Sequence, residues 1–221
     1  MNYIKKACKA ILPHTVKPRV IPFGLAKGIK ATIDFEYDTG FFFGRHEREL
    51  FPYYRRYVTP GTRCFDVGGY RGWDALIFAK LSGGANILTF ESNENSLTHM
   101  RESFKASGYS IDILHGYVGS KDEPNTVTID DAAEKFFKPD FIKMDIEGHE
   151  VEALKGAQNV LSACGPGLVI EVHSRKLEEE CRSLLQAHGY SPTLVEQASY
   201  AGKEFRGMSH NRWLVCDRLS R

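Results

Sequence analysis

The chain has 221 residues, 42% of them hydrophobic, which is enough for one well-packed α/β domain with some chain left over. Its 29 basic and 28 acidic side chains give a net charge of +1, so we expect a small or neutral partner and no nucleic acid. The five cysteines form no CxxC pair, and no apolar run approaches the ~20 residues of a membrane span, so we expect free thiols and a cytoplasmic protein.

The beginning of the chain differs in pattern from the rest. We predict an extension over residues 1–58, which would cap the substrate, and a main domain over residues 59–221. Residues 1–12 are basic with spaced apolar side chains and lack a cleavage site, so they do not resemble a signal peptide. We interpret them as a helix packed on its own domain, with weak contact to a membrane surface as the alternative.

The remainder of the extension carries local signals. Residues 29–37 partly alternate apolar and polar side chains, which predicts a strand. Residues 50–58 have helical spacing, with Pro52 near the start of the helix. The three aromatic residues Phe41–Phe43 are interpreted as core filling, and a substrate lid is the alternative.

From residue 62 onward, short apolar strands alternate with helical segments. The expected strands cover residues 64–67, 87–90, 111–114, 141–146 and 168–172, and residues 193–195 and 213–216 close the sheet. Asn93 is the expected N-cap of the helix after the second of these strands. This alternation predicts a mainly parallel sheet with helices on both faces, and such sheets bind ligands at the carboxyl ends of their strands.

The loop Asp66-Val67-Gly68-Gly69-Tyr70-Arg71-Gly72 follows the first strong strand. Its glycines let the backbone turn sharply and approach a ligand, and Trp73 just beyond them can line the same pocket or belong to the core. The pattern reads DxGxxxG, whereas a dinucleotide fold requires GxGxxG and no leading acid. A carboxylate beside the loop repels phosphate, so a sulfonium cofactor such as S-adenosylmethionine (SAM) fits this loop better than a dinucleotide.

Glu91 stands at the tip of the second strand, about 25 residues after Asp66. A carboxylate at this place can accept hydrogen bonds from both ribose hydroxyls of an adenosine. Ser92, directly after it, and Tyr117, after the third strand, are further candidates for cofactor binding. The combination of Glu91 with the DxGxxxG loop favours SAM.

Acidic residues and histidines follow the next two strands. Asp145 and Glu147 are two residues apart, so a continued strand would point both to one side, and Glu171 and His173 repeat this spacing. If the two strands are neighbours, these four side chains converge. Three roles stay open for them: a general base, with His173 favoured and His149 as second candidate; a divalent-metal site of Asp145, Glu171 and His173; or a structural cluster.

The segments CFDVGGYRG, TFESNENS, DFIKMDIEGHEVEALKGA and LVIEVH occur in this order and resemble the FkbM-type family of SAM-dependent methyltransferases. The resemblance implies a seven-stranded, Rossmann-like class I methyltransferase fold and O-methylation of natural products or sugars. It implies that Asp66, Gly68 and Gly72 hold the methionine and ribose side of SAM, that Glu91 binds the ribose, and that Asp145 borders the methyl-transfer site. The chain departs from the family in having Gly69-Tyr70 for Ala-Asn and Ser92 for Pro.

We therefore expect a SAM-dependent methyltransferase that acts on a hydroxyl of a small metabolite, natural product or sugar. N-methylation and a SAM-binding protein without activity are the alternatives, and an NAD-dependent oxidoreductase is disfavoured by the missing GxGxxG. A convergent group of titratable side chains favours an enzyme over a binding module. A divalent metal held by Asp145, Glu171 and His173 is the less favoured alternative, and the sequence makes no prediction of the oligomeric state.

Overall fold

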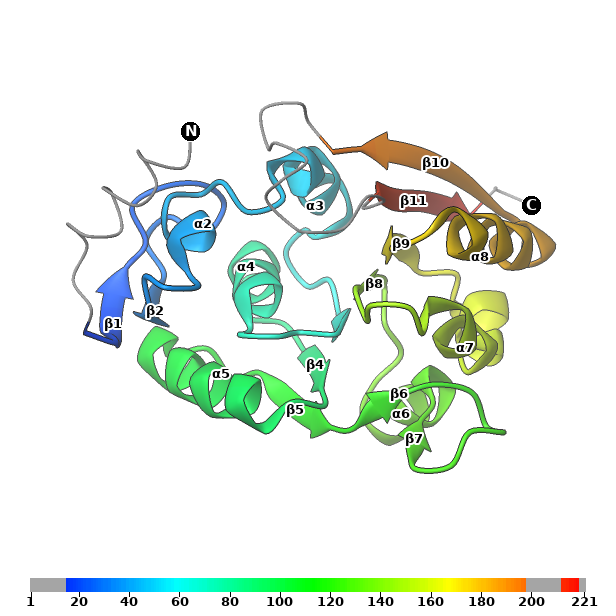
Figure 1. Ribbon diagram of the computed structural model, residues 1–221, viewed down its shortest axis with the longest axis horizontal. Coiled ribbons are helices and arrows are strands. Elements are labelled where there is room, and N and C mark those ends of the chain that lie inside the picture. The colour runs from blue at the N-terminus through cyan, green and yellow to red at the C-terminus, as the bar shows by residue number, and fades with distance from the viewer. Residues whose placement is uncertain (1–14, 198–211, 219–221) are drawn as a thin grey trace.

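The computed structural model describes residues 15–197 and 212–218, and the predicted helix at residues 1–12 lies outside this part. A seven-stranded sheet forms the centre of the molecule, with the strand order β10-β11-β9-β8-β3-β4-β5 (Figure 1). Its strands are β3 (Cys64–Val67), β4 (Ile87–Glu91), β5 (Asp112–His115), β8 (Phe141–Met144), β9 (Gly167–Val172), β10 (Tyr190–Glu196) and β11 (Arg212–Arg218). β11 runs antiparallel to both of its neighbours, and the other adjacent pairs are parallel. The predicted class I methyltransferase architecture is confirmed.

Helices cover both faces of this sheet. One face packs against α3 (Phe51–Tyr57), α4 (Trp73–Leu81) and α5 (Glu94–Ser107), and the other against α6 (Ile129–Lys135), α7 (Glu150–Lys155), the π-helical segment η2 (Val160–Cys164) and α8 (Arg175–Ala187). Asn93 is the N-cap of α5, as predicted, because its Oδ1 accepts hydrogen bonds from the backbone N–H groups of Asn95 and Ser96. No helix in the described ranges is long and apolar enough to cross a membrane.

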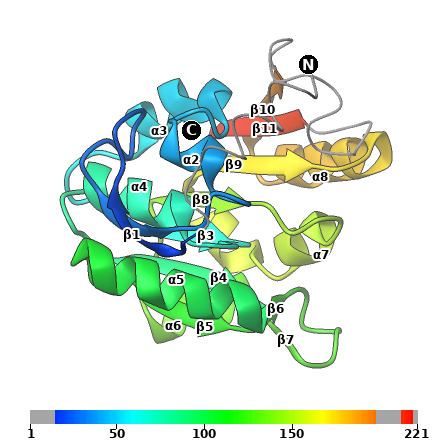
Figure 2. The same ribbon diagram turned by 60° about the vertical axis from the view of Figure 1, so that its left-hand side comes forward.

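Residues 15–58, the N-terminal segment, wrap around the α4 and α5 face (Figure 2). This segment contains the antiparallel pair β1 (Lys17–Val20) and β2 (Lys30–Ile33), the short helix α2 (Thr39–Phe42), the 3-10 turn η1 (Arg48–Leu50) and α3. β2 is shorter than the strand predicted at residues 29–37, because the chain turns at residues 35–38. Pro52 lies in the first turn of α3, as predicted.

The aromatic run within this segment divides between core and surface. Phe41 is buried and stacks on Trp73, with ring centroids 5.7 Å apart, whereas Phe43 is 39% exposed. Buried side chains of this segment belong to the same hydrophobic core as α4, α5 and one face of the sheet. Phe41 therefore fills the core, as the first interpretation of the run expected.

Strand periodicity sets which side chains reach each face. In β3, Phe65 and Val67 point to the α6–α8 face, so Asp66 points to the α4 face. Lys143 of β8 lies beside Asp66 in the register and points the same way. A buried polar row thus crosses the sheet beneath the N-terminal segment, near the carboxyl ends of the strands.

Between β5 and β8 the chain forms the small parallel pair β6 (Tyr117–Val118) and β7 (Thr126–Val127), followed by α6. Thr128 is the N-cap of α6, and its hydroxyl accepts a hydrogen bond from Asp131 N. The cysteines within the described ranges, Cys64, Cys164, Cys181 and Cys216, are free thiols, as expected.

Candidate active site

A cavity of about 670 Å³ opens at the carboxyl ends of β3, β4, β8 and β9. This volume is within the range of natural small-molecule sites. One end of the cavity is formed by the glycine loop, by the residues after β4 and by the β6 region. The other end is formed by the residues after β8 and β9 and by the N-terminal segment, which supplies His46 and Glu47. We call these the loop end and the acid end.

Close packing explains the two glycines at the loop end. Gly68 has a φ of 86°, and a Cβ at this position would collide with the backbone oxygen of Asp145. A Cβ on Gly69 would collide with the Thr89 hydroxyl. Both residues line the cavity, so bare backbone faces a ligand there. Trp73 lines the cavity as well, although its ring also packs on the core residue Phe41.

Two residues predicted to contact the cofactor do not line the cavity. Asp66 is fully buried beneath the loop, where Thr89 Oγ1 donates to its Oδ2 over 3.3 Å. Burial raises the pKa of Asp66 to about 7, against the opposing charge of Lys143. Gly72 is the N-cap of α4, and a Cβ on it would meet Phe104. Asp66 and Gly72 therefore shape the loop from below.

Glu91 lines the cavity at the tip of β4 and is 9% exposed. The backbone N–H of Tyr70 donates to its Oε2 and that of Asn93 to its Oε1, each over 2.7 Å. These bonds fix the carboxylate, and each oxygen keeps a lone pair for a further donor. Ser92 and Tyr117 line the cavity nearby, and Tyr117 is 67% exposed.

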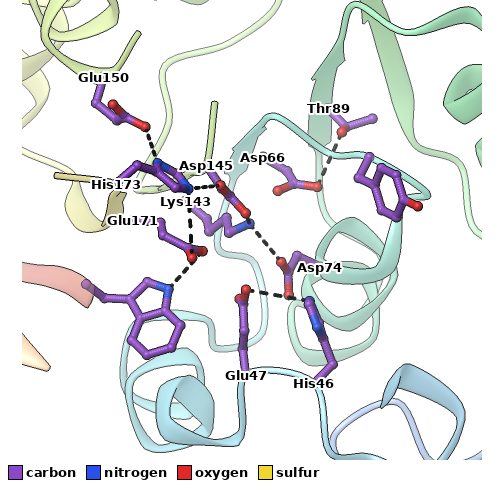
Figure 3. A network of polar contacts seen from close by, with 12 residues as sticks. His46, Glu47, Asp66, Asp74, Thr89, Lys143, Asp145, Glu150, Glu171 and His173 are labelled. Carbon is purple, nitrogen blue, oxygen red and sulfur yellow. Dashed lines mark hydrogen bonds and ion pairs between the residues drawn. The ribbon is translucent and has the colours of Figure 1, made fainter. Parts of the chain in front are cut away.

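His173 is the centre of the acid end (Figure 3). Its Nδ1 lies 2.8 Å from Glu150 Oε1, and its Nε2 lies 3.4 Å from Asp145 Oδ1 and 3.9 Å from Glu171 Oε1. Burial alone would lower the pKa of His173, but the hydrogen bonds and charges of Asp145 and Glu150 raise it to about 10. The ring is therefore an imidazolium near neutral pH, with both nitrogens facing carboxylates. This charge state works against the predicted role of His173 as a general base.

Lys143 is a residue that the sequence reasoning missed. Its ammonium is 3% exposed and lies 3.2 Å from Asp74 Oδ2 and 3.4 Å from Asp145 Oδ2. Burial opposes its charge, yet Asp145 and Asp74 raise the pKa of Lys143 well above its ordinary value. Burial likewise opposes the ionisation of Asp145, but Lys143 and His173 hold the pKa of that carboxyl well below its usual range. A lysine inside the buried strand FIKM was the available signal, because such a charge requires partners.

The segment after β8 differs from the prediction. The strand ends at Met144 and not at residue 146, so the two-residue alternation does not extend to Glu147. Glu147 adopts a left-handed conformation with a φ of 49°, is exposed, and lies at the rim of the cavity. The expected pairing of Asp145 with Glu147 on one side of a strand is therefore wrong. His149 lines the rim too, but it is exposed at the N-cap of α7.

Among the described residues, two groups of side chains have the spacing of metal ligands. Ligand atoms of Asp145, Glu171 and His173 lie within 4.8 Å of one another, and so do those of His46, Glu47 and Asp74. The predicted convergence of Asp145, Glu171 and His173 is thus observed. However, the Lys143 ammonium lies between the two groups, and His173 is itself cationic, so a divalent ion would meet charge repulsion in either place. The geometry favours a salt-bridged cluster over a metal site.

Comparison with known proteins finds a family match for part of the chain. Residues 100–192 match the model of the methyltransferase FkbM domain. The hexuronic acid methyltransferase AglP of Haloferax volcanii is 29% identical over 136 residues, covering 50% of this chain and 55% of that protein. The chain thus spans about half the length of this curated relative.

Two solved structures share the fold at low identity. Precorrin-6y C5,15-methyltransferase from Geobacter metallireducens has a TM-score of 0.59 at 14% identity and covers 79% of this chain and 89% of its own. Methyltransferase FkbM from Methylobacillus flagellatus has a TM-score of 0.55 at 19% identity, and the match covers 74% of this chain and 50% of that protein. Together with the sheet order, these structures show the class I methyltransferase fold, and the domain match over residues 100–192 relates that part of the chain to the FkbM-type methyltransferases.

Proposed function

We propose that this protein binds SAM and transfers its methyl group to a hydroxyl of a small, sugar-like acceptor. The observation that carries the proposal is that one cavity joins both ends: a fixed carboxylate at the tip of β4 faces the glycine loop, and the same cavity continues into the acid end. The named substrate class of the Haloferax volcanii relative supports a sugar-like acceptor.

The residues at the loop end fit SAM. Glu91 offers free lone pairs beside its two backbone hydrogen bonds, which suits a ribose diol. Gly68 and Gly69 expose backbone where an amino-acid tail would lie, with Trp73, Ser92 and Tyr117 as further walls. SAM would supply an electrophilic methyl on a cationic sulfonium. The lining contains six carboxylates (Glu47, Asp74, Glu91, Asp145, Glu147 and Glu171) and one lysine, so its charge suits a cation.

The acid end would hold the acceptor. Asp145 borders both ends of the cavity, and its contacts with Lys143 and His173 fix its position. Rigid polar groups of this kind can orient a hydroxyl for in-line displacement, which is the main source of rate enhancement in such a transfer. The excess of carboxylates also keeps a second candidate open, methylation of an amine, because an ammonium-bearing acceptor would be attracted to the same surface.

Calorimetric titration with SAM and transfer of label from methyl-labelled SAM test the proposal. The acceptor source is the small-molecule fraction of the cells that produce the protein, and mass spectrometry of the labelled product distinguishes O-methyl from N-methyl. Glu91→Gln should weaken SAM binding by about 1–3 kcal/mol, because a charge-assisted acceptor is lost. Glu102→Gln, an exposed change on α5, is the matched control. Absence of SAM binding by the wild-type protein would refute the proposal.

A further inference from the structure

We propose that His46 is the general base that takes the proton from the acceptor hydroxyl, and that Glu47 positions it and stabilises its charged form. This inference rests on the proposed methyl transfer. It assigns a catalytic residue from the N-terminal segment, outside the part of the chain that matches the FkbM domain model.

Among the described residues, three imidazoles line the cavity, and the structure separates them. Both ring nitrogens of His173 face carboxylates, with Glu150 at 2.8 Å and Asp145 at 3.4 Å, so this ring already carries its proton. His149 stands exposed at the rim, and its side chain forms no cap hydrogen bond to α7. His46 is partly buried, with 23% of its side chain exposed. Of the three, His46 is therefore the imidazole that is held in the cavity without a carboxylate close to each of its ring nitrogens.

Its surroundings hold the His46 ring in place. The backbone N–H of His46 donates to Gly40 O over 3.1 Å, which ties the residue to α2. The ring packs edge-on against Trp73, with centroids 4.7 Å apart and an interplanar angle of 75°. Trp73 in turn stacks on the buried Phe41. A base must be held within reach of its proton, and this aromatic support provides that order.

Carboxylates near His46 would stabilise the imidazolium formed by proton uptake. His46 Nε2 lies 3.7 Å from Glu47 Oε1, and a carboxylate oxygen of Asp74 on α4 lies within 4.8 Å of the same group. Facing them from β8 is the Lys143 ammonium, which is paired with Asp74. Tyr54 of α3 is buried beside Asp74 and Glu47, whose charges add to burial in raising its pKa well above the ordinary value. The carboxylates of Glu47 and Asp74 therefore outnumber the one ammonium that faces them.

Glu47 is held in an unusual backbone conformation. Its φ is 44°, a left-handed value that costs free energy for a residue other than glycine, and the residue as a whole is 3% exposed. This conformation begins the η1 turn and directs the side chain into the cavity wall.

In the transfer, a lone pair of the acceptor oxygen forms the new O–CH₃ bond, and the S–CH₃ bond breaks with its electron pair going to sulfur. The hydroxyl proton goes to His46.

Chemical labelling tests the proposal without any methyl transfer. Diethylpyrocarbonate acylates neutral imidazole and does not react with imidazolium. At about pH 7, peptide mapping should find adducts on His46 and on the exposed His149, and His173 should stay unmodified. Modification of His173, or an unreactive His46 beside a modified His149, would overturn the assignment. Because this readout requires neither SAM nor an acceptor, it stays informative if the proposed function fails.

Kinetics then test the role. His46→Gln should leave the SAM dissociation constant unchanged and reduce transfer from methyl-labelled SAM by about 10²–10⁴-fold, as expected for loss of a general base. The same substitution at His188, which caps α8 and contacts Gln158 away from the cavity, is the control. Glu47→Gln should move the acid limb of the kcat/KM profile to lower pH, and His46→Gln should abolish that limb. A His46→Gln enzyme with the wild-type rate would refute the proposal.

Discussion

Raising the pH should remove the stabilisation that the His173 imidazolium gives to the folded state. The ring is 8% exposed and lies between Glu150 and Asp145. Burial lowers the pKa of His173, and the two carboxylates outweigh burial and raise the value from 6.5 to about 10. The folded protein therefore retains a proton between these pH values, whereas the unfolded chain loses it.

The sign and size of the effect follow from linkage. Below the unfolded pKa, both states are protonated and the stabilisation is complete. Between pH 6.5 and about 10 the folded state binds more protons, so the free energy of unfolding falls as the pH rises. Each pKa unit corresponds to about 1.4 kcal/mol, which gives a loss of about 5 kcal/mol over the full range. Since whole domains of this size are stable by about 5–15 kcal/mol, the effect is large.

Urea unfolding of the wild-type protein and His173→Gln at a series of pH values measures this loss. Glutamine keeps a donor for Glu150 but carries no charge. The variant should be less stable by about 3–5 kcal/mol at pH 6, and the difference should shrink toward pH 10. Asp66, whose pKa burial raises to about 7, titrates in both proteins and cancels in the difference. A difference that does not change with pH would refute the charged state of His173.

Two further predictions concern the remaining charges of the acid end. Lys143→Met should destabilise the protein by about 3–5 kcal/mol at neutral pH, because Asp74 and Asp145 lose their buried partner. Thermal or urea unfolding should show a smaller loss of stability at acid pH. An unchanged unfolding midpoint would contradict the pairing. The rate of methyl transfer should be the same with and without EDTA, because Lys143 lies between the two groups of side chains that have the spacing of metal ligands. Activity that is lost with EDTA and restored by Mg²⁺ or Mn²⁺ would overturn this reasoning.

The sequence predicted the sheet and the position of the glycine loop well because these features depend on local signals. Buried strands read as short apolar runs, and the Gly68-Gly69 turn can be recognised because a Cβ at either position would collide with a neighbouring strand or its following loop. Glu91 was found because the last residue of a parallel strand necessarily faces the binding edge. Such positions follow from topology alone.

The acid end was predicted less completely because it depends on contacts between distant segments. Lys143 stands within an apolar strand, and only the register of β8 with β3 and the start of α4 reveal its partners. His46 and Glu47 come from a segment without a recognisable pattern, which reaches the cavity by wrapping over α4. The misplacement of Glu147 has a local cause, since the strand gives way to a left-handed turn two residues earlier than the pattern indicated.

The boundary that we predicted near residue 58 can be tested at Asp38, which joins the N-terminal segment to the glycine loop. Asp38 is fully buried; its Oδ1 lies 2.7 Å from Arg71 Nε and its Oδ2 lies 3.3 Å from His99 Nε2. Asp38→Asn leaves the mostly buried Arg71 with weakened charge compensation, and we expect a loss of about 3 kcal/mol or more.

The shape of the unfolding curve then distinguishes a separable cap from one cooperative unit. Residues 21–58 share their hydrophobic core with α4, α5 and the sheet, so the wild-type protein and Asp38→Asn should each unfold in a single transition. Because Arg71 follows Tyr70, whose N–H holds Glu91, the variant should also bind SAM more weakly. Two separate transitions, of which only the first moves in the variant and SAM affinity stays unchanged, would show instead that the segment is an independent cap.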